Sequence, residues 1–442
     1  MTAPAPASSS QAAPSQAATS PAADASVSVD RPCRFCAVPV RQLVVDLGMS
    51  PLCENFLTRE ELNRMEPFYP LSAWVCQKCL LVQVEEFVSG REIFGGEYAY
   101  FSSFSDSWLK FAEEYADRMT ERLNLTSDSF VLELASNDGY LLKNFVEKGV
   151  PCLGVEPAAN CAAAAEKIGV PSRVEYFGVE VAEKLAAEGV AADLLIANNC
   201  AAHVPDLNDF IGGMKRVLKP GGTITVEVAH WLNMFEQTQF DQIYQEHYCY
   251  FSLLTLREVF AAHGMTLYDV DEIPTHGGSL RVYARHEDAD YQGEPLPVTD
   301  AVEALCERER AAGLTEMSTY EDYGRRVERV KRDLLDFLIT AKRNGKSVVG
   351  YGAPGKGNTL LNYCGIRQDF LDYVVDRNPY KHGRFLPGTH IPVHPTERIA
   401  ETKPDYVLIL PWNLRPEISA QLEYVREWGA QLVVPIPELD VF

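Results

Sequence analysis

The middle of the chain alternates short apolar runs with amphipathic segments. Such runs are typical of buried parallel strands, and the segments between them repeat apolar side chains at helical spacing. The pattern predicts strands at 131–134, 152–155, 193–197 and 223–227, helices at 140–148, 160–167, 181–188 and 207–217, and a turn at Lys219–Gly222. This alternation predicts an α/β fold with a mostly parallel sheet.

A similar pattern returns near the C-terminus. It predicts strands at 347–351, 370–375 and 406–410, a helix at 360–364, and a glycine-rich loop at 352–359 after the first of these strands. A loop of this kind either cradles phosphates, with Lys356 adding a cation, or belongs to a Rossmann-like unit that serves only as a scaffold. Residues 302–342, rich in Glu, Arg and Leu at helical spacing, are expected to form helices that pack the two larger domains together.

The turn after the first central strand is a candidate cofactor site. Glu133 stands in that strand, Asn137 and Gly139 follow in the turn, and Glu156 ends the next strand, where a carboxylate can grip a ribose diol. A dinucleotide fingerprint needs three glycines, but this turn contains only Gly139. The carboxylate of Glu133 would repel phosphates, so the pattern favours a cationic, phosphate-free cofactor such as S-adenosylmethionine.

Two C-x-x-C motifs, Cys33–Cys36 and Cys76–Cys79, precede this domain. Four thiolates can surround Zn²⁺ tetrahedrally and close its coordination shell, which predicts a structural metal site. A redox role is the alternative, but it needs only one pair beside a βαβ unit. Cys53, between the motifs, is interpreted as an ordinary, partly buried cysteine.

Composition narrows the functional class. The chain has 442 residues, 46% of them hydrophobic, and a formal net charge of -22, which argues against a nucleic-acid partner. No apolar run is long enough for a membrane span. Its 11 cysteines are unevenly spaced, and residues 1–29, rich in Ala, Ser, Pro and Gln, are predicted to be a disordered tail rather than a signal. These features predict a cytoplasmic protein.

Acid–base side chains gather in a later segment. Tyr244, Glu246 and His247 lie close together in the chain, and Asn198 and His203 follow the third central strand, at the sheet edge where active sites form. Histidine can accept a proton near neutral pH, whereas tyrosine is the better hydrogen-bond donor to an enolate. The cluster therefore predicts an active site.

Other segments allow both a structural and a functional interpretation. The loop before Trp108 is either a capped helix start at Ser105 or Asp106, or a lid in which Tyr98 and Ser105 face the ligands. A second set of residues could meet a phosphate or carboxylate: Ser279 and Arg281 after a glycine turn, and Lys356, Asn358, Arg377 and Lys381 in the C-terminal unit.

Taken together, the motifs resemble the C-methyltransferases of deoxysugar biosynthesis. Besides the two cysteine pairs, the resemblance rests on SxxSDSW (102–108), ELASNDGYLL (133–142), NNCAAHVPDLNDF (198–210), YQEHYCYFS (244–252), HGGSLR (276–281) and GAPGKGNTLLNYCGI (352–366). It covers nearly everything after the tail and keeps the family's order. The extended tail, Cys53 and Cys200 depart from the family pattern.

The resemblance implies a class I methyltransferase core between a zinc-binding N-terminal module and a second, Rossmann-like C-terminal domain. The expected boundaries are 30–90, 91–295 and 296–442. The implied substrate is a nucleotide-linked 4-keto deoxysugar, usually carrying thymidine diphosphate, which is methylated beside the ketone. The implied base is His247 or Glu246. Tyr98, Tyr244 and His203 would stabilise the enolate or position the sugar. Glu133, Asn137, Gly139, Glu156, Asn198 and Ser105 would hold the cofactor.

Three alternatives remain open from the sequence: a methyltransferase that acts on oxygen or nitrogen, a nicotinamide-dependent enzyme, and a non-catalytic zinc-bearing binding protein. The oligomeric state, for which a monomer is the simplest case, and the identity of the sugar also stay open.

Overall fold

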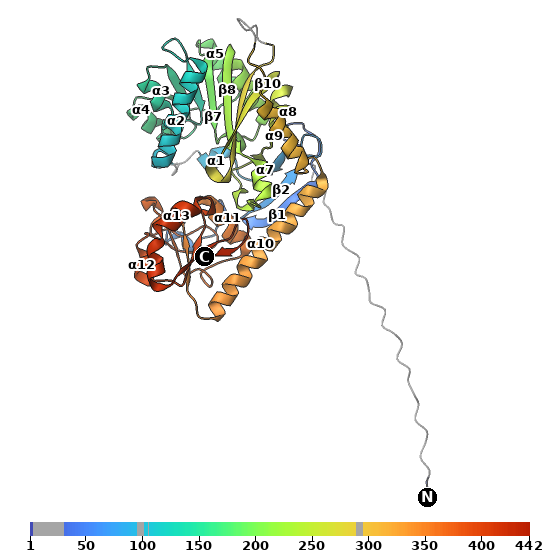
Figure 1. The fold of residues 1–442 in the computed structure, drawn as a ribbon, viewed down its shortest axis with the longest axis vertical. Helices are drawn as coiled ribbons and strands as arrows, with labels where there is room; N and C mark the ends of the chain where they lie inside the picture. Colours follow the sequence, from blue (N-terminus) through green and yellow to red (C-terminus); the bar gives the residue numbers. More distant parts are fainter. Residues whose placement is uncertain (3–30, 95–100, 105, 289–294) are drawn as a thin grey trace. The chain divides into compact units, whose positions relative to one another are not determined.

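Three β-sheets organise the protein (Figure 1). The computed structural model describes residues 1–2, 31–94, 101–104, 106–288 and 295–442. Residues 3–29 of the expected tail, and the side chains of Tyr98 and Ser105, lie outside these ranges. Within them, no helix is both long and apolar enough to cross a membrane.

The N-terminal sheet draws on two distant parts of the chain. Its order is β1-β2-β3-β9, from β1 (Gln42–Ser50), β2 (Tyr69–Val75), β3 (Val82–Val84) and β9 (Cys249–Tyr250), all paired antiparallel. β9 comes directly after the acid–base segment that contains His247. The cysteine-bearing module and that segment therefore share one hydrogen-bonded sheet.

The central sheet has seven strands in the order β10-β11-β8-β7-β4-β5-β6. They are β4 (Val131–Leu134), β5 (Cys152–Val155), β6 (Ser172–Arg173), β7 (Ala192–Asn198), β8 (Leu218–Ala229), β10 (Met265–Ile273) and β11 (Ser279–His286). β4 to β8 are mutually parallel, and β11 runs antiparallel to both β8 and β10. The α/β prediction is confirmed. The predicted turn at Lys219–Gly222 is wrong, because these residues belong to β8.

Helices cover both faces of this sheet. They are α2 (Asp106–Leu123), α3 (Leu142–Glu147), α4 (Ala159–Lys167), α5 (Val179–Ala187), α6 (Leu207–Val217), α7 (Trp231–Glu236) and α8 (Leu253–Ala262). Two of them begin at classical capping side chains: Asp206 accepts the amide of Asp209 before α6, and Ser252 accepts that of Thr255 before α8. The predicted helix at 140–148 is shorter, because a turn occupies its first residues.

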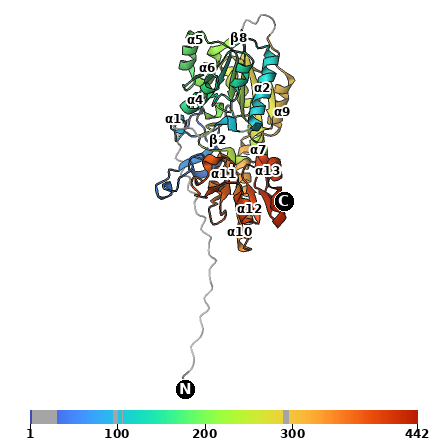
Figure 2. The ribbon, with the colours of Figure 1, turned by 90° about the vertical axis from the view of Figure 1, so that its left-hand side faces the viewer.

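The C-terminal sheet follows two connecting helices, α9 (Asp300–Ala311) and α10 (Met317–Arg343). Its order is β14-β13-β12-β15-β16-β17, from β12 (Val348–Tyr351), β13 (Val374–Val375), β14 (Val393–His394), β15 (Tyr406–Ile409), β16 (Gln431–Val434) and β17 (Asp440–Val441). α12 (Arg398–Thr402) and α13 (Arg415–Gln421) lie beside it (Figure 2). β12 to β16 are mutually parallel, and β17 pairs antiparallel with β16.

Two predictions for this unit need correction. α11 spans Gly355–Cys364, so Lys356 and Asn358 lie in its first turns rather than in a loop. The strand predicted at 370–375 is reduced to its last two residues. α10 packs against both β1 and α11, so this long helix touches the N-terminal sheet and the C-terminal unit together.

Candidate active site and metal centre

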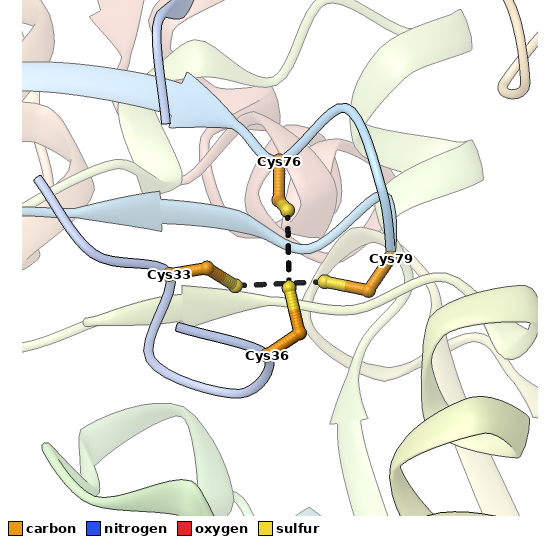
Figure 3. A group of neighbouring side chains, drawn as sticks. All are labelled: Cys33, Cys36, Cys76 and Cys79. Atoms are coloured by element: carbon orange, nitrogen blue, oxygen red, sulfur yellow. Dashed lines mark hydrogen bonds between the residues drawn. The ribbon is translucent and has the colours of Figure 1, made fainter. Parts of the chain in front are cut away.

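The four paired cysteines converge on one point (Figure 3). Their sulfur atoms all lie within 4.8 Å of one another, and the pairs Cys33–Cys79 and Cys36–Cys76 are 3.5 Å apart. Four sulfurs bound to zinc at about 2.3 Å would be about 3.8 Å apart, so the donors fit a tetrahedral ion.

The two cysteine turns have the same local geometry. In each turn, the residue after the second cysteine donates its amide hydrogen to the carbonyl of the first cysteine. Ala37 donates to Cys33 and Leu80 donates to Cys76, both at 2.9 Å. Ala37 and Leu80 both adopt a left-handed backbone, with φ of 58° and 62°. Matched turns present two thiols each to the same centre, which supports a closed, structural Zn²⁺ site.

The cofactor candidates meet at the carboxyl ends of β4 and β5. Glu156 Oε2 accepts the amide of Asn137 and its Oε1 accepts the amide of Ala158, both at 2.8 Å. Asn137 has a φ of 49° and Gly139 a φ of 78°. A Cβ on Gly139 would lie 3.0 Å from Val170, so close packing and backbone conformation both favour glycine there.

Residues 102 and 103, which precede α2, fold over this turn. The amide of Ser102 donates to Asn137 Oδ1 at 3.0 Å, and that of Ser103 donates to Asp138 Oδ2 at 3.1 Å. The segment predicted to be a lid or a helix cap therefore contacts the cofactor turn directly at these two residues.

The turn is rich in buried hydrogen-bond acceptors. Among the described residues, Glu133 Oε2, Asp138 Oδ1 and Asn198 Oδ1 are buried without a hydrogen-bond partner. Burial, then the nearby Glu156 and Asp138, raise the pKa of Glu133 well above its ordinary value. Unpaired acceptors and crowded carboxyl groups suit a ligand that brings positive charge, and S-adenosylmethionine carries a sulfonium and an ammonium group. These residues fit that cofactor.

The acid–base segment brings His247 against two other rings. Its ring centroid is 4.1 Å from that of Tyr244 and 4.7 Å from that of His203. His247 Nδ1 lies 3.2 Å from the carbonyl oxygen of Gln242. Because a carbonyl can only accept, Nδ1 carries the proton and Nε2 keeps its lone pair. Burial lowers the pKa of His203 to about 4, and burial followed by the charge of His203 lowers that of His247.

Cys53 is closer to this cluster than its sequence suggested. It is 3% exposed, and its thiol lies 3.9 Å from Glu246 Oε1. Burial, then the neighbouring Glu54, raise the pKa of Glu246 to about 8. Cys53 is fully buried rather than partly buried, because the segment that follows β1 reaches the acid–base cluster. No local pattern reveals this contact across 193 positions.

Of the predicted phosphate-binding residues, three lie near this region. Lys356 Nζ donates to Asn413 Oδ1 at 2.9 Å and lies over the Trp412 ring, and Lys381 Nζ donates to the Ala353 carbonyl at 2.8 Å. Asn358 Nδ2 donates to the Cys53 carbonyl at 2.6 Å. The side chain of Arg377 is 71% exposed and lies 3.9 Å from Glu417.

Ser279 and Arg281 lie inside the central sheet. Arg281 is 2% exposed, pairs with Glu227 Oε2 at 2.6 Å, and stacks over the Tyr115 ring. Ser279 donates to the Thr275 carbonyl. The guanidinium charge is thus balanced by its cross-strand neighbour on β8.

Two further residues connect the units. Trp412 Nε1 donates to Asp241 Oδ2 at 2.7 Å, and Asp241 Oδ1 has no partner within the described ranges. Trp412 and Asn413 also border a cavity of about 880 Å³, together with Gly277, Gly278 and the end of β16. The sequence marked neither Asp241 nor Trp412; only the clustering of polar and aromatic residues around 240–252 pointed to the first.

The C-terminal unit repeats the acidic strand end of the central sheet. Asp376, just after β13, accepts the amides of Ala353 and Asn378, both at 2.7 Å. Glu156 does the same with Asn137 and Ala158. Both α/β units therefore use a carboxylate at the end of the second strand to order the turn after the first.

Comparisons with known proteins show which families this chain resembles. Family models match a zinc binding domain at residues 33–94, a methyltransferase domain at 108–270 and a C-methyltransferase C-terminal domain at 274–437. C-methyltransferase NovU of Streptomyces niveus is 35% identical over 92% of this chain and 95% of its own length. Ubiquinone biosynthesis O-methyltransferase of a Bradyrhizobium strain is 28% identical over 32% of this chain and 64% of its own.

Among solved structures, 1,6-didemethyltoxoflavin-N1-methyltransferase of Burkholderia thailandensis, with bound S-adenosylhomocysteine, is 18% identical. The match covers 47% of this chain and 95% of that one, with a TM-score of 0.34.

Proposed function

We propose that this chain, which belongs to the S-adenosylmethionine-dependent C-methyltransferases, methylates the carbon beside the ketone of a nucleotide-linked 4-keto deoxysugar. C-methylation follows from the family. The sugar nucleotide, with thymidine diphosphate as the expected carrier, is the proposal. It is supported by the acid–base cluster, which contains a candidate base to remove the proton from the α-carbon and candidate donors to the enolate oxygen.

The central observation is the tautomer of His247. A carbon beside a ketone becomes nucleophilic only after it loses a proton, so the site needs a base with a free lone pair. The Gln242 carbonyl holds the proton on Nδ1 and leaves Nε2 available. The lowered pKa of His247 keeps the ring neutral at pH 7. Glu246, whose pKa is about 8, is mostly protonated there, which favours His247 as the base.

The remaining cluster residues suit the negative charge that forms. Burial raises the pKa of Tyr244 well above its ordinary value, so the phenol stays a donor. We assign Tyr244 and His203 to hold the enolate oxygen or the sugar, together with Tyr98, which lies outside the described residues. Donors aimed at a developing oxyanion contribute strongly in a site shielded from water.

The cofactor is held by the turn after β4. We assign Glu133, Asn137, Gly139, Glu156 and Asn198 to it, with Ser105 as a further candidate outside the described ranges. Bound S-adenosylmethionine supplies the electrophilic methyl group.

The nucleotide is assigned to the side of the C-terminal unit. The cavity beside Trp412 and Asn413 has a volume of about 880 Å³, within the range of ligand pockets. Lys356 reaches its wall through Asn413. We assign Lys356, Asn358 and Lys381 to the nucleotide sugar and leave Arg281 out, because Glu227 already neutralises it.

The test is mass spectrometry of the zinc-loaded protein with S-adenosylmethionine and a panel of thymidine-diphosphate 4-ketosugars in deuterated water. A gain of one methyl, located by NMR on the carbon beside the ketone, is the expected result. A methyl on oxygen or nitrogen would overturn the acceptor assignment. Deuterium exchange without methylation would support the assigned base and reject the tested sugar as the methyl acceptor. If no sugar gains deuterium or a methyl group, the proposal is rejected.

A further inference from the structure

The zinc module extends one segment, residues 50–57, between the other two parts of the protein. Gln245 Nε2 donates to the Ser50 carbonyl at 3.1 Å, and Leu57 pairs with Phe385 through two backbone hydrogen bonds of 2.9 and 3.0 Å. Between these anchors, the Cys53 carbonyl accepts Asn358 of α11. The middle of this segment therefore lies between the acid–base cluster and the first turns of α11.

Glu54 is the charged side chain of this segment, and it binds the beginning of α11. Its carboxylate lies beside Gly355, the first residue of that helix. Glu54 Oε2 also lies 3.6 Å from Lys381 Nζ. A Cβ on Gly355 would come within 2.9 Å of Glu54 Oε1 and 3.0 Å of Cys53 Sγ. The first amides of a helix lack internal partners and attract negative charge, so this carboxylate is a stabilising occupant.

We propose that Glu54 is a positioning residue of the acceptor site: paired with Lys381 beside the beginning of α11, it holds Cys53 of the zinc module against the Glu246 carboxyl group. The module would then form a wall of the acceptor site as well as binding metal. The inference rests on the proposed function only where it concerns turnover.

The local charges give this arrangement a chemical consequence. Glu246 faces Cys53 and Glu54 from the zinc module, and Tyr244 and Tyr248 from its own segment. Glu54 in turn faces Lys381 and Asp376. Burial is the main cause that keeps Glu246 protonated near neutral pH, and the charge of the partly exposed Glu54, screened in part by solvent, adds a smaller contribution. A protonated Glu246 can donate a hydrogen bond, whereas an ionised one can only accept.

The first test measures the position of Cys53 without any turnover. The full-length, zinc-loaded protein is treated with iodoacetamide, and labelling of each cysteine is followed by peptide mass spectrometry. Cys364, at the end of α11, is equally buried at 3% exposure and serves as the internal reference. Iodoacetamide reacts with the thiolate, and loss of the Glu54 charge alone favours the Cys53 thiolate, so Glu54→Gln, which removes that charge and keeps the shape, is the reference for this effect. Glu54→Ala should raise the labelling rate of Cys53 relative to Cys364 at least tenfold more than Glu54→Gln does. An unchanged ratio, or an equal rise in both rates, would overturn the proposal.

Glu66→Ala is the matched control. Like Glu54, Glu66 is a zinc-module carboxylate that binds the C-terminal unit: it accepts the amide of Gly388 at 2.8 Å, but it does not contact Cys53. This variant should leave the labelling ratio unchanged. If it raised the ratio as much as Glu54→Ala, a general loosening of the module would explain both results and the specific role of Glu54 would be rejected.

The second test uses Glu54→Gln, which removes the charge and keeps the shape. Without that charge the pKa of Glu246 falls, so the alkaline limb of kcat/KM should move to lower pH, with S-adenosylmethionine affinity and zinc content unchanged. A limb that stays in place would overturn the electrostatic role. If no sugar is turned over at all, the proposed substrate fails, and the labelling result still decides the position of Cys53.

Discussion

The imidazole rings of His203 and His247 lie edge to face, with their centroids 4.7 Å apart and their planes at 83°. One follows β7 and the other precedes β9, so the contact joins the central sheet to the strand shared with the zinc module. Because both pKa values are lowered by burial, the pair is neutral at pH 7. Two neutral rings can pack this closely without the repulsion that two charged rings would suffer.

Replacing His247 tests the assignment of the base. His247→Asn should lower turnover by about 10²- to 10⁴-fold, the usual contribution of a general base. Affinity for S-adenosylmethionine should stay close to that of the wild type, because the side chain lies outside the cofactor turn. Turnover assays and calorimetric titration measure the two quantities. His263→Asn, which alters a histidine bound to Asn208 instead, is the control and should keep full activity. Undiminished turnover in His247→Asn would transfer the role to Glu246.

Cofactor binding should release protons. Glu133 has a raised pKa in the free protein, and a bound cation favours its ionised form, so binding lowers that pKa. Affinity for S-adenosylmethionine should therefore rise with pH until Glu133 is ionised in the free protein as well. S-adenosylhomocysteine, which lacks the sulfonium charge, should release fewer protons. Calorimetry in two buffers with different ionisation enthalpies measures the number released.

Glu133→Gln should abolish most of this proton release and reduce the preference for S-adenosylmethionine over S-adenosylhomocysteine. Glu147→Gln changes a carboxylate at the end of α3 and should leave both properties intact. Equal proton release by the wild type and Glu133→Gln would show that another group titrates.

Loss of one zinc ligand should remove the metal. Cys76→Ser is expected to lose bound zinc and to lower the melting temperature, because three thiolates leave the coordination shell open and two turns lose their common anchor. Elemental analysis and thermal unfolding check both effects. Cys306→Ser, which alters a buried cysteine in α9, should retain a full metal complement. A full complement in Cys76→Ser would contradict the four-cysteine site.

The buried hydrogen bond from Trp412 to Asp241 should contribute to stability. Trp412→Phe removes the donor and leaves a buried carboxyl oxygen unpaired, at a cost of about 1–3 kcal/mol in the free energy of unfolding. Trp428→Phe is a matched control, since the indole of the half-buried Trp428 donates to the Pro404 carbonyl at 3.0 Å. Denaturant titration should give a smaller loss there. An equal or larger loss in Trp428→Phe would argue against a special role for the Asp241 contact.

The difference in unfolding free energy between the wild type and Trp412→Phe should depend on pH, because the Asp241 carboxyl group titrates. Burial is the main cause that raises the pKa of Asp241 to about 6, whereas the Trp412 hydrogen bond lowers it. A raised pKa gives stability that is present below the ordinary value near 3.8 and is lost as pH rises through about 6. The hydrogen bond offsets part of this loss, so the gap between wild type and Trp412→Phe should widen from pH 4 to pH 7.

Much of this protein could be predicted from local sequence. The spacing of Cys33, Cys36, Cys76 and Cys79 predicted the metal ligands, because each pair forms its turn within a few residues. Hydrophobic periodicity located the central strands and helices, and parallel strands necessarily bring their carboxyl ends to one edge, which placed Glu133 near Glu156. The boundary near Lys219 was missed because β8 includes residues 219–222 as an irregularity in its pairing with β7, and the one near Gly355 because α11 begins inside the glycine-rich segment.

Only the tertiary structure decided which distant groups meet. Glu227 lies opposite Arg281 because β11 pairs with β8, and the resulting ion pair neutralises the arginine. Cys53 reaches Glu246, and Trp412 reaches Asp241, across 193 and 171 positions. Periodicity reports the environment along one element, whereas such contacts depend on how whole sheets and helices pack. Residue types and spacing thus determined the metal, the cofactor class and the strands, and packing decided the neighbours and charge balance of each side chain in the site.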